Sequence, residues 1–240
     1  MGIIIFNGRS TATYGINIWS SPDYKIPERD QEVYHVPGRS GDLIVDYGSY
    51  KNVERTYTVS LGSDDASFPA LARAIADWVS SATGYAVLQD SYEPDVYRMA
   101  RFASSLDITN VLDRAALATI TFDCKPQRFL LEGDANHPIT VSNGGRVPNN
   151  TQNVANPRIT VSGSGNGSIR VGDRTVSFTN LTSSGITVDC EMQECYTGTT
   201  SQNSNVTMTD GFPKVPPGGA TLIYDGGITS VRVVLNTWIL

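Results

Sequence analysis

Hydrophobic and polar residues alternate along much of the first half of the chain, which is the pattern of half-buried β-strands. Runs of this kind occupy residues 3–6, 16–19, 31–36, 53–61, 85–88, 96–102 and 117–122. Residues 20–29 contain two prolines and are expected to form a loop or an edge. Pro126 predicts the end of the last of these strands, because proline cannot donate to a strand ladder. The first half is therefore expected to be mainly β.

Helical spacing occurs in one segment. Phe68, Leu71, Ile75, Trp78 and Val79 recur at intervals of three and four residues, which places them on one face of a helix. A glycine follows this segment at position 84, where a helix can end. We expect this helix to cover one side of a sheet.

A turn followed by a strand lies near position 40. Pro37 restricts φ, and Gly38 and Gly41 supply the positive φ that tight turns require. From Leu43 to Tyr47 every second residue is apolar, so these side chains share one face of an extended segment. The pattern predicts a chain reversal and a half-buried strand, continued beyond Gly48 into a long ribbon.

The composition changes after about residue 136. Glycine, asparagine, serine and threonine become frequent and helical periodicity disappears, so we expect two domains, residues 1–135 and 136–240. Residues 163–167 contain three glycines and predict a turn between two strands, and Gly172 with Asp173 predicts a tight hairpin. Short strands at regular spacing favour a β-sandwich for the second domain.

Charge and cysteine usage exclude several classes of protein. The formal net charge is −6 at pH 7, which argues against specific binding of nucleic acid phosphates. No signal peptide or apolar membrane span is recognised, so we expect folding in a cytoplasm and no membrane insertion. Cys124, Cys190 and Cys195 form no Cys-x-x-Cys spacing, which favours buried free thiols over disulfides.

Catalytic chemistry has little support. His35 and His137 are the only histidines and neither belongs to a metal-binding or nucleophile-activating motif, so no metal, cofactor or catalytic residue is expected. Asp189, Glu191 and Glu194 are close enough in sequence for glycoside hydrolysis, but carboxylates at an exposed strand end are common. We therefore expect a protein that is not an enzyme.

A glycan-binding module is the alternative function. Sandwiches can bind sugars through an exposed aromatic ring with polar neighbours, and Tyr196, Tyr224 and Trp238 are candidates in the second domain. Packing into the core is the competing interpretation for each of these side chains.

Several short motifs, in order along the chain, resemble the distal tail protein of long-tailed, siphovirus-like phages and prophages. In the first half these are Phe6-Asn7-Gly8, Val36-Pro37-Gly38-Arg39-Ser40-Gly41, Gly48-Ser49-Tyr50-Lys51-Asn52, Asp90-Ser91-Tyr92-Glu93-Pro94-Asp95 and Phe122-Asp123-Cys124-Lys125-Pro126. In the second half they are residues 186–196, 211–218 and the terminal strand 231–238. The resemblance spans essentially the whole chain.

The resemblance implies an architectural function. The first domain would be a β-rich, split-barrel-like unit that assembles into a hexameric ring, and the second a galectin-like β-sandwich. Such a ring joins the tail tube protein to the tail-tip protein and, in many phages, carries receptor-binding proteins. It would be assembled in the bacterial host cytoplasm and reside at the tail tip of the virion, with DNA passing through its channel.

Two hypotheses follow for this chain. Residues Val36, Pro37, Gly38, Arg39, Ser40 and Gly41 are the candidate subunit interface, because an extended ribbon can add to a neighbour's sheet through backbone pairing. The acidic balance predicts a channel wall that is acidic or neutral, since a basic wall would retain passing DNA.

Overall fold

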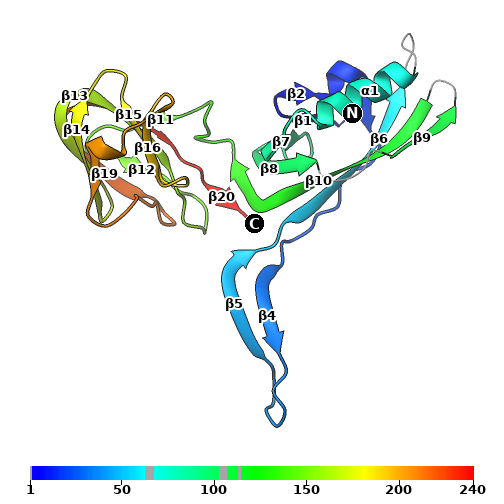
Figure 1. Cartoon of the computed structure of the whole chain (residues 1–240), viewed down its shortest axis with the longest axis horizontal. Coiled ribbons are helices and arrows are strands. Elements are labelled where there is room, and N and C mark those ends of the chain that lie inside the picture. Colours follow the sequence, from blue (N-terminus) through cyan, green and yellow to red (C-terminus); the bar gives the residue numbers. More distant parts are fainter. Residues whose placement is uncertain (1, 63–67, 103–106, 113–114) are drawn as a thin grey trace. The chain divides into compact units, whose positions relative to one another are not determined.

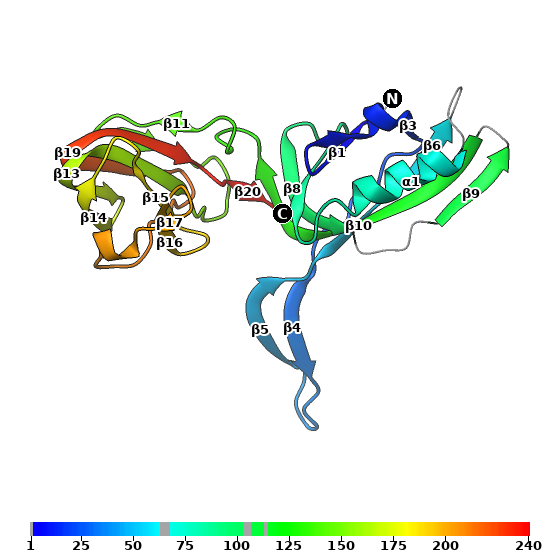
Figure 2. The same cartoon turned by 45° about the horizontal axis from the view of Figure 1, so that its top comes forward.

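The computed structural model describes residues 2–62, 68–102, 107–112 and 115–240 (Figures 1 and 2). It divides into a first unit, Met1–Arg128 with Leu240, and a second unit, Phe129–Ile239. The boundary expected between residues 135 and 136 lies inside the second unit. Both units consist mainly of strands, and α1 (Phe68–Val79) is the only α-helix in the described part of the chain. The expected fold class, mainly β with one helix, is confirmed.

The first unit is built around one sheet in the order β2-β1-β7-β8-β10-β6-β3, with β9 also paired to β10. Its elements are β1 (Ile4–Phe6), β2 (Arg9–Ser10), a 3-10 helix (Thr11–Tyr14), β3 (Ile16–Ile18), β4 (Arg29–Tyr34), β5 (Leu43–Tyr50), β6 (Val53–Gly62), α1, β7 (Ala86–Asp90), β8 (Val96–Phe102), β9 (Asp107–Leu112) and β10 (Ala115–Leu130). A bridge between Gly2 and Ile18 links the beginning of β1 to β3 at the other end of the sheet. The sheet is therefore curled on itself like a half-barrel.

The concave side of this sheet holds an aromatic core. Phe122 is fully buried and contacts the rings of Phe6, Tyr57 and Phe102 at centroid distances of 4.8, 6.1 and 6.2 Å. The buried Trp78 of α1 donates from Nε1 to the carbonyl oxygens of Phe6 and Arg9. The helix predicted from three- and four-residue spacing thus forms, and it packs on the sheet as expected.

Pro126 does not end β10, contrary to the sequence prediction. β10 pairs with β6 from Ala115 to Cys124, and Pro126 lies beyond that last pair, where a missing N–H breaks no bond to β6. The strand therefore continues through the proline to Leu130.

β4 and β5 form a separate two-stranded sheet, which we call the arm (Figures 1 and 2). The predicted chain reversal between these strands is confirmed, and so are the positive φ angles of Gly38 (82°) and Gly41 (83°). The prediction of a half-buried strand is wrong, because Leu43, Val45 and Tyr47 are all exposed. The described residues contain no second layer that covers either face of the arm.

The second unit is a folded-over sheet with two layers around one core. Its elements are β11 (Ile139–Thr140), β12 (Arg146–Val147), β13 (Arg158–Val171), β14 (Arg174–Leu181), β15 (Ile186–Asp189), β16 (Glu194–Thr197), β17 (Thr200–Ser201), a 3-10 helix (Asn203–Asn205), β18 (Val206–Met208), β19 (Ala220–Val234) and β20 (Trp238–Ile239). One half of β13 pairs with β15, the other half pairs with β14, and β19 follows β13 through both halves. The two long strands thereby belong to both layers.

Glycines lie where β13 and β19 bend from one layer to the other. A Cβ on Gly163 would lie 2.1 Å from the carbonyl oxygen of Gly227, and one on Gly227 would lie 1.8 Å from that of Ser164. The pairing register shifts at the same place. The predicted turn at residues 163–167 is therefore wrong: these glycines permit a close-packed bend within a single strand.

Candidate functional site

Apolar side chains lie exposed on both faces of the arm. Opposite residues of paired strands share a face, so Tyr34 and Leu43 lie on one face with Val45, while Val33 and Ile44 lie on the other. All five are exposed, Ile44 to 57%. Exposed apolar patches of this kind mark interaction surfaces, and an isolated two-stranded hairpin is marginally stable in water.

Polar groups on the first face are tied to the arm itself. The hydroxyl of Tyr34 donates to the carboxylate of Glu32. Hydrogen bonds from Tyr34 and Tyr47 lower the pKa of Glu32, and the same bonds raise the pKa values of the two tyrosines. The carboxylate and both hydroxyls are therefore partnered within the arm, which leaves aromatic rings and aliphatic groups as the surface available to a partner.

The tip of the arm is the predicted interface, Val36, Pro37, Gly38, Arg39, Ser40 and Gly41, and all six residues are exposed. A Cβ on Gly38 or Gly41 would meet no atom within 4 Å. Their role is therefore conformational, since a positive φ is unfavourable for residues with a side chain. The tip connects β4 to β5. It thereby fixes the strand register that places the exposed apolar side chains of the two strands opposite one another.

A bulge sits at the base of the arm. The register of the two strands shifts between Asp30 and Gln31, so that Tyr47 and Gly48 have no direct partner in β4. Gly48 has a φ of 75°, and its N–H donates to Asp46 Oδ1 at 2.8 Å. Bulges bend and twist a ribbon, so this one sets the direction in which the arm leaves the sheet.

Side-chain contacts hold this base together. The Arg29 guanidinium contacts Asp46 Oδ2 at 3.1 Å and lies 4.9 Å from the ring centroid of Tyr50. Across the ribbon, Ser49 donates to Asp30 at 3.2 Å. The arm is thus fastened at its base and exposed along its length.

The loop before the arm is anchored to the first unit. Pro22 and Pro27 are buried, whereas Trp19 and Ile26 expose 71% and 85% of their surface. Tyr24 is exposed and donates from its hydroxyl to Glu93 Oε1 at 2.8 Å. Residues 20–28 therefore form a loop, as expected for the segment 20–29.

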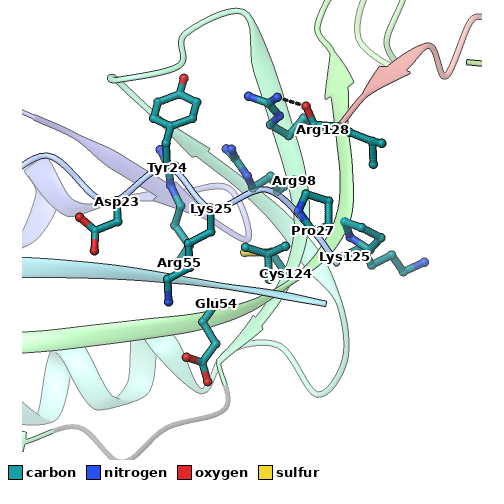
Figure 3. Close-up of a pocket in the computed structure, with 13 residues that line it drawn as sticks. Asp23, Tyr24, Lys25, Pro27, Glu54, Arg55, Arg98, Cys124, Lys125 and Arg128 are labelled. Carbon is teal, nitrogen blue, oxygen red and sulfur yellow. Dashed lines mark hydrogen bonds between the residues drawn. The ribbon is translucent and has the colours of Figure 1, made fainter. Parts of the chain in front are cut away.

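A buried cluster of charges lies beneath Tyr24. Figure 3 shows Arg55, Arg98 and Arg128 around the small pocket next to this ring. All three guanidinium groups contact the buried Glu93 carboxylate, Arg55 at 3.2 Å and Arg128 at 2.8 Å. We call Glu93 and these three arginines, together with Asp90, the charge cluster.

Asp90 completes the cluster from the end of β7. Its Oδ2 accepts from Arg55 at 2.8 Å and from the Tyr57 hydroxyl at 2.6 Å, while Oδ1 accepts from the backbone N–H groups of Tyr92 and Glu93. Burial raises the pKa of Tyr57, as does the neighbouring Asp90. Every buried side-chain polar atom in the described residues has a hydrogen-bond partner, so the cluster is internally satisfied.

Electrostatics keep Glu93 ionised. Burial alone would raise its pKa, but hydrogen bonds from Tyr24 and Arg128 and the charge of Arg98 outweigh that effect and lower the pKa to about 2. The carboxylate is therefore an ion that offsets part of the positive charge of the three arginines and binds Tyr24 of the loop before the arm.

Sequence reasoning missed the charge cluster. A signal was present, because Arg55 occupies the buried phase of β6 together with Tyr57 and Val59. A charged residue at such a position requires a buried counterion. The counterions belong to the segment with Asp90 and Glu93, which the sequence shows only as a polar turn.

The candidate aromatic residues of the second unit do not form one surface. Tyr196 is half-buried in β16, and Tyr224 in β19 packs against the core. β13 and β15 separate β16 from β19 in the sheet. Arg232 of β19 lies in the same cross-strand row as Tyr196, and Tyr224 lies eight residues from Arg232 along β19. Trp238 donates from Nε1 to the carbonyl oxygen of Val154 at 3.1 Å. A groove that uses all three rings is not formed.

The candidate carboxylates have structural partners. Asp189 is buried, and its Oδ1 accepts from the backbone N–H groups of Glu191 and Met192. Glu191 accepts from the side-chain amide of Asn156 at 2.8 Å. Asp189 therefore closes a turn, and the Glu191 carboxylate is held by Asn156.

The described residues contain neither a metal-binding cluster nor a membrane-spanning helix. Within the described residues, no group of three or more His, Cys, Asp or Glu side chains is placed to hold a metal ion. Across the same residues, no helix has the length and apolar character needed to cross a membrane.

Comparisons with known proteins place this fold. No protein-family model matches the chain, and no curated protein matches it. Among solved structures, the fold is that of a phage tail hub protein. The chain is similar to the crystal structure of SPP1 Dit (gp 19.1), described as a paradigm of the hub adsorption apparatus in phages that infect Gram-positive bacteria. The likeness covers 100% of both chains with a TM-score of 0.75 at 12% sequence identity, and it confirms the resemblance to distal tail proteins at the level of fold.

Proposed function

We propose that this protein is a structural component of a phage tail, a distal tail protein whose copies form a hexameric ring. The ring joins the tail tube protein to the tail-tip protein and, where present, to receptor-binding proteins. It is assembled in the bacterial host cytoplasm and resides at the tail tip of the virion. The likeness of fold to SPP1 Dit over the whole chain supports the class of protein.

The single observation that carries the ring is the exposed arm. An arm with apolar rows on both faces has two surfaces to cover, and the described residues of its own chain cover neither. In a closed ring, every copy gives its arm to one neighbour and receives an arm from the other, so one kind of contact satisfies all copies. The arm thus acts as the subunit-joining element, with residues 36–41 at its tip.

Two pairs of substitutions test the arm without altering the core. Leu43→Ser with Val45→Ser removes apolar groups from one face, and Gly38→Val with Gly41→Val disfavours the positive φ angles of the tip. We expect both double variants to lose ring formation, measured by light scattering after size exclusion and by negative-stain imaging. The second unit should remain folded in both, because all four substituted residues belong to the first unit.

A matched control uses exposed residues outside the arm. Leu117 and Ile223 are exposed at 37% and 38%, so Leu117→Ser with Ile223→Ser removes comparable apolar surface. Rings are expected to persist in this control. Intact rings in both arm variants would contradict the arm as the subunit-joining element.

A further inference from the structure

Two arginines of the second unit lie side by side on the outer face of the sheet. Arg158 pairs with Val234, and Arg232 pairs with Thr160, so the arginines are diagonal neighbours on β13 and β19. Such neighbours lie about 7–8 Å apart, within reach of two long side chains that converge on one group. Both line a shallow pocket with Thr160, Val234, Ala135 and Pro138.

Neither guanidinium has a carboxylate partner among the described residues. Asp189 is opposite Arg158 in the strand register, but its Oδ1 caps its own turn, and no ion pair within 4 Å joins it to either arginine. Asp134, next to the pocket, accepts from Asn136 and His137. By contrast, Arg146 and Arg174 are bound to backbone carbonyl oxygens.

Arg158 and Arg232 place two positive charges side by side in a unit that is acidic overall. The second unit carries eight acidic and six basic side chains, so it is acidic overall, and like charges placed next to one another in a sheet are destabilising. An anionic ligand would remove that repulsion and would accept the donor forks of both guanidinium groups.

Hydroxyl groups and an aromatic ring continue the site across the sheet. Arg232, Thr160, Thr187 and Tyr196 occupy one cross-strand row on four adjacent strands, and none of the four is fully buried. With strands about 4.8 Å apart, this row is about 14 Å long. The Thr160 and Thr187 hydroxyls are 3.0 Å apart, and one of the two hydrogens remains available to a ligand.

We propose that this row binds an anionic saccharide, with Arg158 and Arg232 on its carboxylate or phosphate group, the threonines on its hydroxyl groups and Tyr196 against a sugar ring. A saccharide fits better than an acidic peptide, because the row offers hydroxyls and a ring along its length and positive charge at one end only. The inference goes beyond the tail role and does not depend on ring formation.

The test measures binding of defined polymers to the full chain by isothermal titration calorimetry. Polygalacturonate carries carboxylates, phosphomannan carries phosphates, dextran is neutral and poly-L-glutamate is an acidic peptide. We expect one of the two anionic polysaccharides to bind, and the one that binds identifies the anionic group. Binding should weaken as salt rises, because charged contacts are screened. Absence of binding by both polysaccharides, equal binding of dextran, or tighter binding of poly-L-glutamate would overturn the proposal.

Matched variants locate the site. Arg158→Gln with Arg232→Gln should weaken binding at least tenfold, and Tyr196→Ala should weaken it several-fold. The control Arg170→Gln with Lys214→Gln removes the same charge from exposed residues outside the pocket and should leave affinity within twofold. An equal loss in the control would show non-specific attraction, and an unchanged affinity in Tyr196→Ala would contradict the four-strand row.

Discussion

Glu93 is the residue that most directly connects the buried charges of the first unit to its surface. Three arginines surround its carboxylate, and Tyr24 reaches it from the loop before the arm. Removing one partner of a buried ion pair leaves an uncompensated buried charge. The loss of stability is then larger than the net stability that the intact pair contributes. The cluster therefore stabilises the unit only as a complete set.

The first prediction concerns this carboxylate. Glu93→Gln keeps the shape but removes the negative charge, so we expect the free energy of unfolding of the first unit to fall by about 3 kcal/mol. Urea denaturation measures the change. Glu54→Gln, at an exposed position on β6, is the matched control and should change stability by less than about 0.5 kcal/mol. Equal effects in both variants would contradict the importance of the cluster.

The second prediction is the pH dependence of the same group. Folding lowers the pKa of Glu93 to about 2 from an ordinary value of 4.5, so its ionised form stabilises the fold above pH 4.5. That contribution is lost as the pH falls from 4.5 towards 2. Unfolding free energies measured across this window should decline more steeply for the natural protein than for Glu93→Gln. Parallel curves would show that the carboxylate is not stabilised by folding.

The third prediction concerns the thiols. Cys124, Cys190 and Cys195 are free and buried, as the sequence predicted, and burial raises the pKa of Cys124 to about 12 and that of Cys195 to about 11. Thiolates are the reactive form, so a thiol reagent at pH 8 should label none of the three in the folded protein. All three should react after unfolding in guanidinium. Rapid labelling of the folded chain would contradict their burial.

At the scale of elements, the arm shows what an alternating pattern can and cannot predict. The turn residues Pro37, Gly38 and Gly41 were recognised because their backbone conformations are local properties. The exposure of β5 could not be recognised, because the same alternation occurs in a strand that its own chain buries and in a strand that another chain buries. Only the absence of a covering layer in the described structure distinguishes the two.

The bend in the second unit shows a different limit. Gly163, Gly165 and Gly167 predict a turn when read alone, yet they form part of one strand. Gly163 and Gly167 are needed because of residues about 60 positions away, Asp225, Gly227 and Ile228, where β19 approaches. A contact so distant in sequence leaves no local pattern. Likewise, the sequence identified Tyr196 as a candidate but not the Arg158 and Arg232 pair, since their proximity depends on strand register.

The fourth prediction tests this bend. Gly163→Ala places a Cβ about 2.1 Å from the carbonyl oxygen of Gly227, so we expect the second unit to lose at least about 3 kcal/mol of stability or fail to fold. Gly165→Ala is the control, because its φ is 71° but its Cβ would lie in open space, and it should cost about 1–2 kcal/mol. Thermal unfolding followed by circular dichroism measures both. Similar losses would argue against backbone approach as the role of Gly163.

At the scale of the whole molecule, fold and charge favour a scaffold. The charge cluster and the turn at Asp189 are internally satisfied, whereas the arm presents apolar groups to solvent. The exposed apolar groups of the arm thus favour association between copies. The acidic balance of the chain, −6, still predicts that the lumen of an assembled ring is acidic or neutral. A ring structure with a lumen lined by Lys and Arg would contradict that prediction.

The central claim is that copies of this chain assemble into a closed ring of six. Native mass spectrometry over a rising protein concentration, with negative-stain imaging of the same samples, tests it most directly. We expect a species of six times 25.9 kDa, or a stacked pair of such rings, with six-fold particles in the images. A chain that stays monomeric at every concentration, or forms assemblies without six-fold symmetry, would contradict the account.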